Sequence, residues 1–110
     1  MSGVRPPRGS RAISARSLET PEMRRLRRRI DALDRRLVAQ LNARAEVARQ
    51  LGRLKSDDGR AVRDPERERE VLLRVAAANE GPLPQADLLA LYRRLMLATR
   101  RLEARDRRAR

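Results

Sequence analysis

The sequence predicts an all-α fold, in which one long and two shorter helices per chain form an intertwined helical-bundle dimer. Apolar residues recur at intervals of three and four along most of the chain, as they do on one face of an α-helix. Clusters of turn-forming residues interrupt this pattern at residues 56–59 and 79–84. No segment alternates between apolar and polar residues with the period of two that is typical of a strand.

The long helix is predicted to begin at Thr20-Pro21-Glu22, which combines a hydroxyl N-cap, a proline at the first helical position and an acid in the first turn. Its apolar stripe runs through Met23, Leu26, Ile30, Leu33, Leu37 and Leu41, and the same spacing continues through Arg44, Ala48, Leu51 and Lys55. The helix should end in Ser56-Asp57-Asp58-Gly59.

The length of this helix predicts the dimer. About 35 helical residues extend for about 50 Å at 1.5 Å per residue. A compact chain of this size has a radius of gyration of only about 13 Å. Other helices must therefore cover the apolar stripe along its length, and a second copy of the chain would supply them.

Two shorter helices follow. The second is expected to begin at Asp64-Pro65, again a cap followed by proline, and to end near Asn79-Glu80-Gly81-Pro82. Pro84 opens the third, which we expect to fray into the Arg-rich end of the chain. Its stripe consists of Leu88, Tyr92, Leu95, Thr99 and Leu102-Glu103. The predicted domain organisation is a disordered Arg/Ser/Pro-rich arm at residues 1–19, one helical domain at 20–106 and a basic tail at 107–110.

Composition excludes several classes of chemistry. The chain has 110 residues and no Cys, His, Trp or Phe, so disulfides, zinc sites and Cys- or His-based catalysis are ruled out, and we expect neither metal nor cofactor. No apolar run is long enough to cross a bilayer or to act as a signal-peptide core, so we expect a cytoplasmic protein without membrane contact.

The net charge of +13 arises from 28 basic and 15 acidic residues, and Lys55 is the only lysine. Such an excess suggests an anionic ligand or nucleic acid. However, proteins that grip single strands usually add aromatic stacking surfaces, and Tyr92 is the only aromatic residue here. We therefore interpret most of the arginines as solvated.

Polar residues interrupt the apolar stripes of all three predicted helices. They are Arg44 and Lys55 in the first, Asp64 and Glu68 in the second, and Thr99 and Glu103 in the third. A buried charge without a partner is costly, so these groups either form inter-helix ion pairs, reach the surface, or share a polar site in the bundle. Six such residues favour the shared site. Its fixed cations would hold carboxylates or phosphates, and its chemistry would be electrostatic stabilisation and conformational restraint of a dianion.

Several motifs together resemble the all-helical (AroQ-type) chorismate mutases. They are Leu26-Arg27-Arg28-Arg29-Ile30-Asp31, Arg44-Ala45-Glu46-Val47-Ala48, Gly59-Arg60-Ala61-Val62-Arg63-Asp64-Pro65-Glu66-Arg67-Glu68 and Thr99-Arg100-Arg101-Leu102-Glu103. The resemblance covers residues 23–105. It implies an intertwined dimer that converts chorismate to prephenate by a Claisen rearrangement, without a cofactor, in aromatic amino acid biosynthesis.

The resemblance also implies a role for each position. Arg27 would be supplied across the dimer interface to bind a substrate carboxylate, and Arg44 would hold a carboxylate within its own subunit. Lys55 would contact a carboxylate and the ether oxygen, where negative charge develops. Asp64, through its backbone, and Glu68 would bind the ring hydroxyl. Three further residues would complete the site. Thr99 would lie near a carboxylate, and Glu103 would lie at the ether oxygen. Arg67 would be a weaker source of positive charge. Lys55, Glu103 and Arg44 would be catalytic.

Glu103 departs from the family pattern, because many members have Gln at this position. An ionised Glu cannot donate a hydrogen bond to the ether oxygen, so Glu103 would have to be protonated. We therefore expect turnover to fall as the pH rises through the ionisation of Glu103, and Glu103→Gln to flatten the profile.

Three alternatives remain open at this stage. The substrate could be 4-amino-4-deoxychorismate in a secondary-metabolite pathway, although Glu103 lies at the wrong end of the site to bind the extra ammonium. The chain could depend on an activating partner enzyme of the same pathway. In a different class, it could be a basic helical module that binds nucleic acid or an acidic partner.

Overall fold

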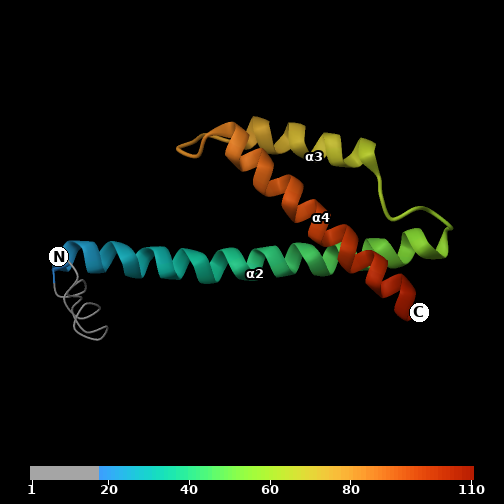
Figure 1. Ribbon diagram of the computed structural model, residues 1–110, viewed down its shortest axis with the longest axis horizontal. Coiled ribbons are helices and arrows are strands. Elements are labelled where there is room, and N and C mark those ends of the chain that lie inside the picture. Colours follow the sequence, from blue (N-terminus) through green and yellow to red (C-terminus); the bar gives the residue numbers. More distant parts are fainter. Residues whose placement is uncertain (1–17) are drawn as a thin grey trace, which may run out of the picture. The chain divides into compact units, whose positions relative to one another are not determined.

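The computed structural model describes residues 18–110, which form three α-helices. Helix α2 spans Pro21–Asp57, α3 spans Pro65–Ala78 and α4 spans Gln85–Ala109, and no strand occurs between residues 18 and 110 (Figure 1). The all-α prediction of one long and two shorter helices is confirmed. All but two residues of the expected N-terminal arm lie outside the described residues.

The chain divides into two compact units, residues 1–41 and 42–110. The described part of the first unit is the N-terminal part of α2 and the short segment before it. The Thr20 hydroxyl caps this helix as predicted, accepting a hydrogen bond from the Met23 backbone amide at 3.1 Å. The apolar stripe here is uncovered, and Leu33 and Leu37 are each 56% exposed. This part of α2 therefore presents an exposed apolar stripe that the described residues do not cover.

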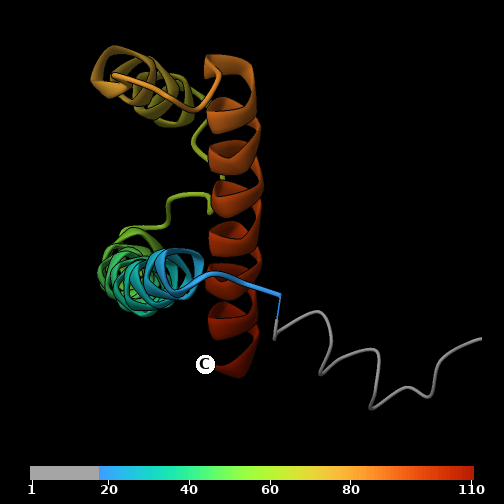
Figure 2. The same ribbon diagram turned by 90° about the vertical axis from the view of Figure 1, so that its left-hand side faces the viewer.

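The second unit contains the C-terminal part of α2 together with α3 and α4. Helices α3 and α4 form a hairpin through residues 79–84, and α4 then crosses the C-terminal part of α2 (Figure 1). Both α3 and this part of α2 lie on the same side of α4 (Figure 2). Met96 and Glu103, on α4, are the buried residues at the centre of the unit, together with Gly52 of α2. The core is therefore thin, and part of it is polar.

Local chemistry accounts for the helix ends. Gly59 follows α2 with φ of 72°, a left-handed conformation that favours glycine. The Asp64 side chain caps α3 by accepting from the Arg67 backbone amide at 3.0 Å, and Pro65 occupies the first helical position. After α3, the Asn79 side chain accepts from the Gly81 amide at 2.9 Å. These boundaries match the predicted ones.

The expected fraying of the third helix does not occur, because α4 remains helical to Ala109. Its last turns are tied to α2 and to the loop that follows α2. Asp106 accepts a hydrogen bond from Arg49 at 2.8 Å, and Arg107 donates to the Arg60 carbonyl at 2.6 Å. Arg110 donates to Asp57 at 2.9 Å. Arginine side chains therefore anchor the last turn of α4, which lies within the predicted basic tail at 107–110.

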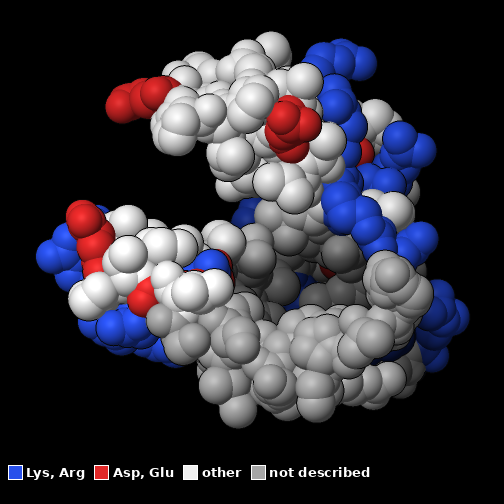
Figure 3. Space-filling view, turned by 60° about the vertical axis from the view of Figure 1, so that its left-hand side comes forward, with Lys and Arg blue, Asp and Glu red and all other residues white. Residues whose placement is uncertain are grey.

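Most of the positive charge is exposed, as predicted. Arg94, Arg101, Arg105 and Arg108 lie along one face of α4, and all four are exposed. Figure 3 shows basic side chains gathered along this helix. At 100° per residue, these positions lie opposite the buried Met96 and Glu103. No helix of the described residues is long and apolar enough to span a membrane.

Candidate active site

A pocket of about 240 Å³ lies in the second unit, between the C-terminal part of α2, the loop after it, α3 and α4. It is lined by six of the predicted site residues: Arg44, Lys55, Asp64, Glu68, Thr99 and Glu103. Arg67 and Arg100 also line it. The pocket is slightly smaller than the range of about 300–1,000 Å³ that is typical of ligand sites. Its size therefore suits a small metabolite rather than a polymer.

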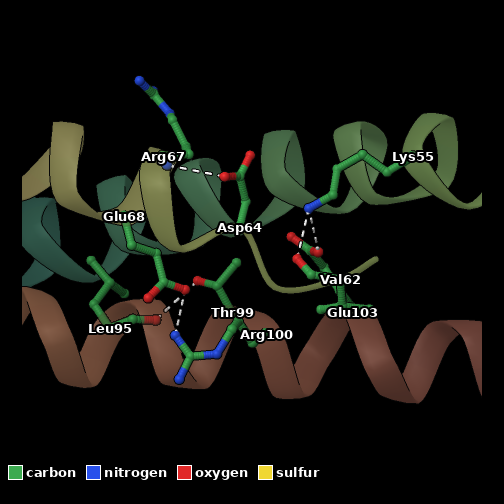
Figure 4. A network of polar contacts seen from close by, with 9 residues as sticks. All are labelled: Lys55, Val62, Asp64, Arg67, Glu68, Leu95, Thr99, Arg100 and Glu103. Atoms are coloured by element: carbon green, nitrogen blue, oxygen red, sulfur yellow. Dashed lines mark hydrogen bonds and ion pairs between the residues drawn. The ribbon is translucent and has the colours of Figure 1, made fainter. Parts of the chain in front are cut away.

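Lys55 reaches into the pocket from the last turn of α2 (Figure 4). Its ammonium donates to the Val62 carbonyl at 2.8 Å and lies 3.5 Å from Glu103 Oε2. The carbonyl belongs to the α2–α3 loop and the carboxylate to α4, so Lys55 connects three parts of the chain. These contacts hold the ammonium in one place, which lets it act as a fixed point charge.

Glu103 is buried, with 7% of its surface exposed, and faces α2 where the two helices cross. Gly52 makes this approach possible: a Cβ at residue 52 would lie 3.0 Å from the Glu103 Cγ. A glycine inside a helix reduces stability by about 1 kcal/mol relative to alanine. Gly52 therefore has a packing role, which is to leave room for the Glu103 side chain.

Glu68 and Arg100 form an ion pair across the α3–α4 interface. Arg100 Nη1 donates to Glu68 Oε2 at 2.5 Å, and the side chains are 26% and 20% exposed, Arg100 first. Beside them, the Thr99 hydroxyl donates to the Leu95 carbonyl of its own helix at 3.0 Å. A hydroxyl has a single proton to donate, so Thr99 would have to rotate before it could donate to a carboxylate.

Asp64 and Arg67 lie at the N-terminus of α3. The Asp64 carboxylate is engaged as the helix cap, which leaves its backbone as the part that could serve a ligand. The Arg67 side chain is exposed and points away from the other residues of the network (Figure 4). Arg67 thus lines the pocket and contributes positive charge to it, but its side chain forms no ion pair with the other residues of the network.

Arg44 is the cation best placed for an anionic ligand. Its guanidinium lies 5.9 Å from the centroid of the Tyr92 ring, a cation–π distance. Between residues 18 and 110, no ion pair joins Arg44 to an acid, whereas Lys55 and Arg100 each face a carboxylate. Arg44 therefore retains its donors for a ligand.

Arg27 is not brought into this pocket. It belongs to the first unit, where its guanidinium forms an ion pair with Glu19. Arg27 lies beside the apolar stripe and among several other arginines, so the pattern of polar residues on the stripes did not indicate it. The resemblance alone indicated it.

Two residues of the site were missed by sequence analysis. Arg100 carried no separate signal, since it is one of many arginines in the third helix. Gly52 did carry one, because an isolated glycine inside a long helical pattern is unfavourable by about 1 kcal/mol relative to alanine.

The pocket suits electrostatic chemistry. It holds fixed cations and carboxylates, whereas His and Cys are absent from the whole sequence. Among the described residues, no three acidic side chains gather as metal ligands. Such a site can bind an anion, restrain its conformation and stabilise charge that develops during a reaction.

Comparison with known proteins agrees with this geometry. A family model described as chorismate mutase type II matches residues 26–104. The chain is 35% identical over 86 residues to a bifunctional chorismate mutase/prephenate dehydratase of Aquifex aeolicus, covering 74% of this chain and 24% of that protein. It is 41% identical over 70 residues to the protein of the same name from Neisseria gonorrhoeae, covering 64% and 19%. The chain therefore spans only about a quarter or less of these relatives' length.

Solved structures of chorismate mutases are similar to this chain in fold. Chorismate mutase (form II) from Thermus thermophilus superposes with a TM-score of 0.75 at 31% identity. The match covers 76% of this chain and 96% of that one. Form I of the same protein gives a TM-score of 0.69 at 29% identity, covering 71% and 98%.

Proposed function

This chain belongs to the chorismate mutase type II family, and we propose that it converts chorismate to prephenate. The observation that carries the proposal is the single pocket that gathers Arg44, Lys55, Glu68 and Glu103 from three helices. The reaction is a unimolecular rearrangement, in which an ether C–O bond breaks as a C–C bond forms. It needs neither a base nor a nucleophile, so a site without His or Cys is adequate.

In this proposal each side chain acts on a different part of the dianionic substrate. Arg44 holds one carboxylate. Lys55 contacts a carboxylate and the ether oxygen, and Glu68, with the backbone of Asp64, binds the ring hydroxyl. Removal of one preorganised donor from such a site typically raises the barrier by about 3–4 kcal/mol. The fixed position of the Lys55 ammonium, 2.8 Å from the Val62 carbonyl, supports this role.

The second carboxylate of the substrate requires a further cation. Within the pocket Lys55 is shared between a carboxylate and the ether oxygen, Arg100 already faces Glu68, and Arg67 points away (Figure 4). We propose that the chain works as a homodimer, in which the partner subunit's Arg27 binds this carboxylate. The exposed apolar stripe of α2 in the first unit supports a dimer, because a second chain would bury it.

The enzymatic proposal is tested with the purified protein and chorismate. Chorismate absorbs in the near ultraviolet and prephenate does not, so turnover should appear as a loss of absorbance. Lys55→Ala should abolish most of this loss, whereas Arg105→Ala, an exposed arginine on the opposite face of α4, should leave it unchanged. A folded wild-type protein that leaves chorismate unchanged, alone and with added cell extract, would contradict the proposal. The extract would supply an activating partner enzyme of the same pathway.

The shared site is tested by mixing two inactive variants. Arg27→Ala and Arg44→Ala each disable one contribution, so a mixed dimer would contain one intact site and one doubly altered site. If subunits exchange at random, an equimolar mixture should recover about a quarter of the wild-type activity. No recovery after complete exchange would contradict a site shared between subunits.

The place of Glu103 at the ether oxygen makes a separate prediction. An amide donates a hydrogen bond whatever its surroundings, whereas an ionised carboxylate only accepts. Glu103→Gln should therefore turn over chorismate at least as fast as the wild type, and Glu103→Ala should be slower than both. A Glu103→Gln variant as slow as Glu103→Ala would show that no donor is needed at this position.

A further inference from the structure

Arg100 changes the electrostatics of the part of the pocket that would face the ring hydroxyl. Its guanidinium donates to Glu68 Oε2 at 2.5 Å, and neither side chain is more than 26% exposed. An ion pair that is partly removed from solvent is screened less by water and salt than a surface pair. The negative charge of Glu68 is therefore balanced by α4 before any ligand binds.

A balanced carboxylate suits a neutral ligand group better than a cationic one. With Oε2 engaged by Arg100, Glu68 Oε1 keeps its lone pairs and can accept a hydrogen bond from a hydroxyl. An ammonium at the same place would approach the Arg100 guanidinium, a like charge within a few ångströms. Their repulsion would offset much of the attraction to Glu68.

The other acids of the pocket do not provide a substitute for Glu68. Asp64 caps α3 through its carboxylate, and Glu103 faces the Lys55 ammonium. Arg44 and Lys55 add positive charge to the lining. Glu68 and Glu103 thus each face a cation already, and the Asp64 carboxylate is engaged with the backbone at the N-terminus of α3.

We infer that Arg100 determines substrate specificity: by balancing Glu68, it selects a substrate with a neutral hydroxyl and disfavours the analogue that carries an ammonium at the same carbon. The inference rests on the proposed function, since it takes Glu68 to face that carbon. It favours chorismate over 4-amino-4-deoxychorismate. Arg100 acts through Glu68 and is therefore a positioning residue rather than a catalytic one.

The experiment compares kcat/KM for chorismate and 4-amino-4-deoxychorismate in the wild-type protein, Arg100→Gln, Arg100→Lys and the control Arg101→Gln. Arg101 is the exposed neighbour of Arg100 on the outer face of α4. The wild type should prefer chorismate. Arg100→Gln should shift the ratio toward the amino substrate by about tenfold or more, which corresponds to about 1.4 kcal/mol. Arg100→Lys should keep most of the preference, and Arg101→Gln all of it.

A merely structural role for Arg100 would lower both rates together and leave their ratio unchanged, which would overturn the inference. A wild-type protein that prefers the amino substrate would overturn it as well. If the wild type turns over neither substrate, the proposed function itself is wrong. This outcome differs from an unchanged ratio of the two rates, which would contradict only the role of Arg100.

Glu68→Gln provides a second test if Arg100→Gln does not fold. This variant leaves the Arg100 charge unbalanced, so its ratio should move in the opposite direction, further toward chorismate. An unchanged ratio in Glu68→Gln would also contradict the inference.

Discussion

Gly52→Ala tests whether the crossing of α2 and α4 sets the position of Glu103. The added Cβ would lie 3.0 Å from Glu103 Cγ and 3.3 Å from Cδ. Carbon atoms prefer separations of about 3.5–4.0 Å, so the contact is too short by about half an ångström. The obstructing atom is in the middle of a side chain that is only 7% exposed, and it cannot swing into solvent.

Two opposing effects determine the stability of this variant. Alanine inside a helix is more favourable than glycine by about 1 kcal/mol. Overpacking of a close contact typically costs about 1–3 kcal/mol. We therefore expect the free energy of unfolding to fall by no more than about 2 kcal/mol. Turnover should fall further, by about tenfold or more, because small displacements of a positioned group reduce rates strongly.

A double-mutant cycle isolates the contact. Glu103→Ala removes the Cγ that the new methyl group would meet, so Gly52→Ala in that background should stabilise the fold by about 1 kcal/mol. Denaturant titrations give the four stabilities, and loss of chorismate absorbance gives the activities. If Gly52→Ala stabilises the otherwise unchanged chain by the full amount and leaves turnover unaltered, Gly52 does not position Glu103.

Two further predictions concern single charges. Lys55→Arg conserves the charge, but a planar guanidinium cannot reproduce an ammonium held 2.8 Å from the Val62 carbonyl. We therefore expect kcat/KM for chorismate to fall by about tenfold or more. Near-wild-type turnover would show that Lys55 has no role in the mechanism. The hydrogen bond from Arg49 lowers the pKa of Asp106, so the pair stabilises the fold while Asp106 is ionised and ceases to do so as the pH falls through that lowered pKa. Asp106→Asn should accordingly be less stable than the wild type at neutral pH, and the difference measured in denaturant titrations should shrink as the pH falls through the lowered pKa of Asp106. A difference that does not change with pH would refute the assignment.

Polar residues on the predicted apolar stripes indicated most of the polar residues that line the pocket. Arg44 and Lys55 interrupt an apolar stripe, and the structure places both in one pocket with Glu68 and Glu103. A polar residue at a helical spacing that should be apolar is a visible local signal. Arg100 gave no such signal, because nothing in its immediate sequence distinguishes it from the surrounding arginines.

By itself, the sequence determined where the three helices begin and where the first two end. Asp64 and Pro65 start one helix and Gly59 follows another through interactions that span only a few residues, so these features can be read locally. Only the tertiary structure decided which charges pair. Lys55 meets Glu103 across 48 positions, and Glu68 meets Arg100 across 32. In a chain with 28 basic residues, many acid–base pairs are equally compatible with the sequence. Only the packing of α4 against α2 and α3 brings these particular side chains together (Figure 4).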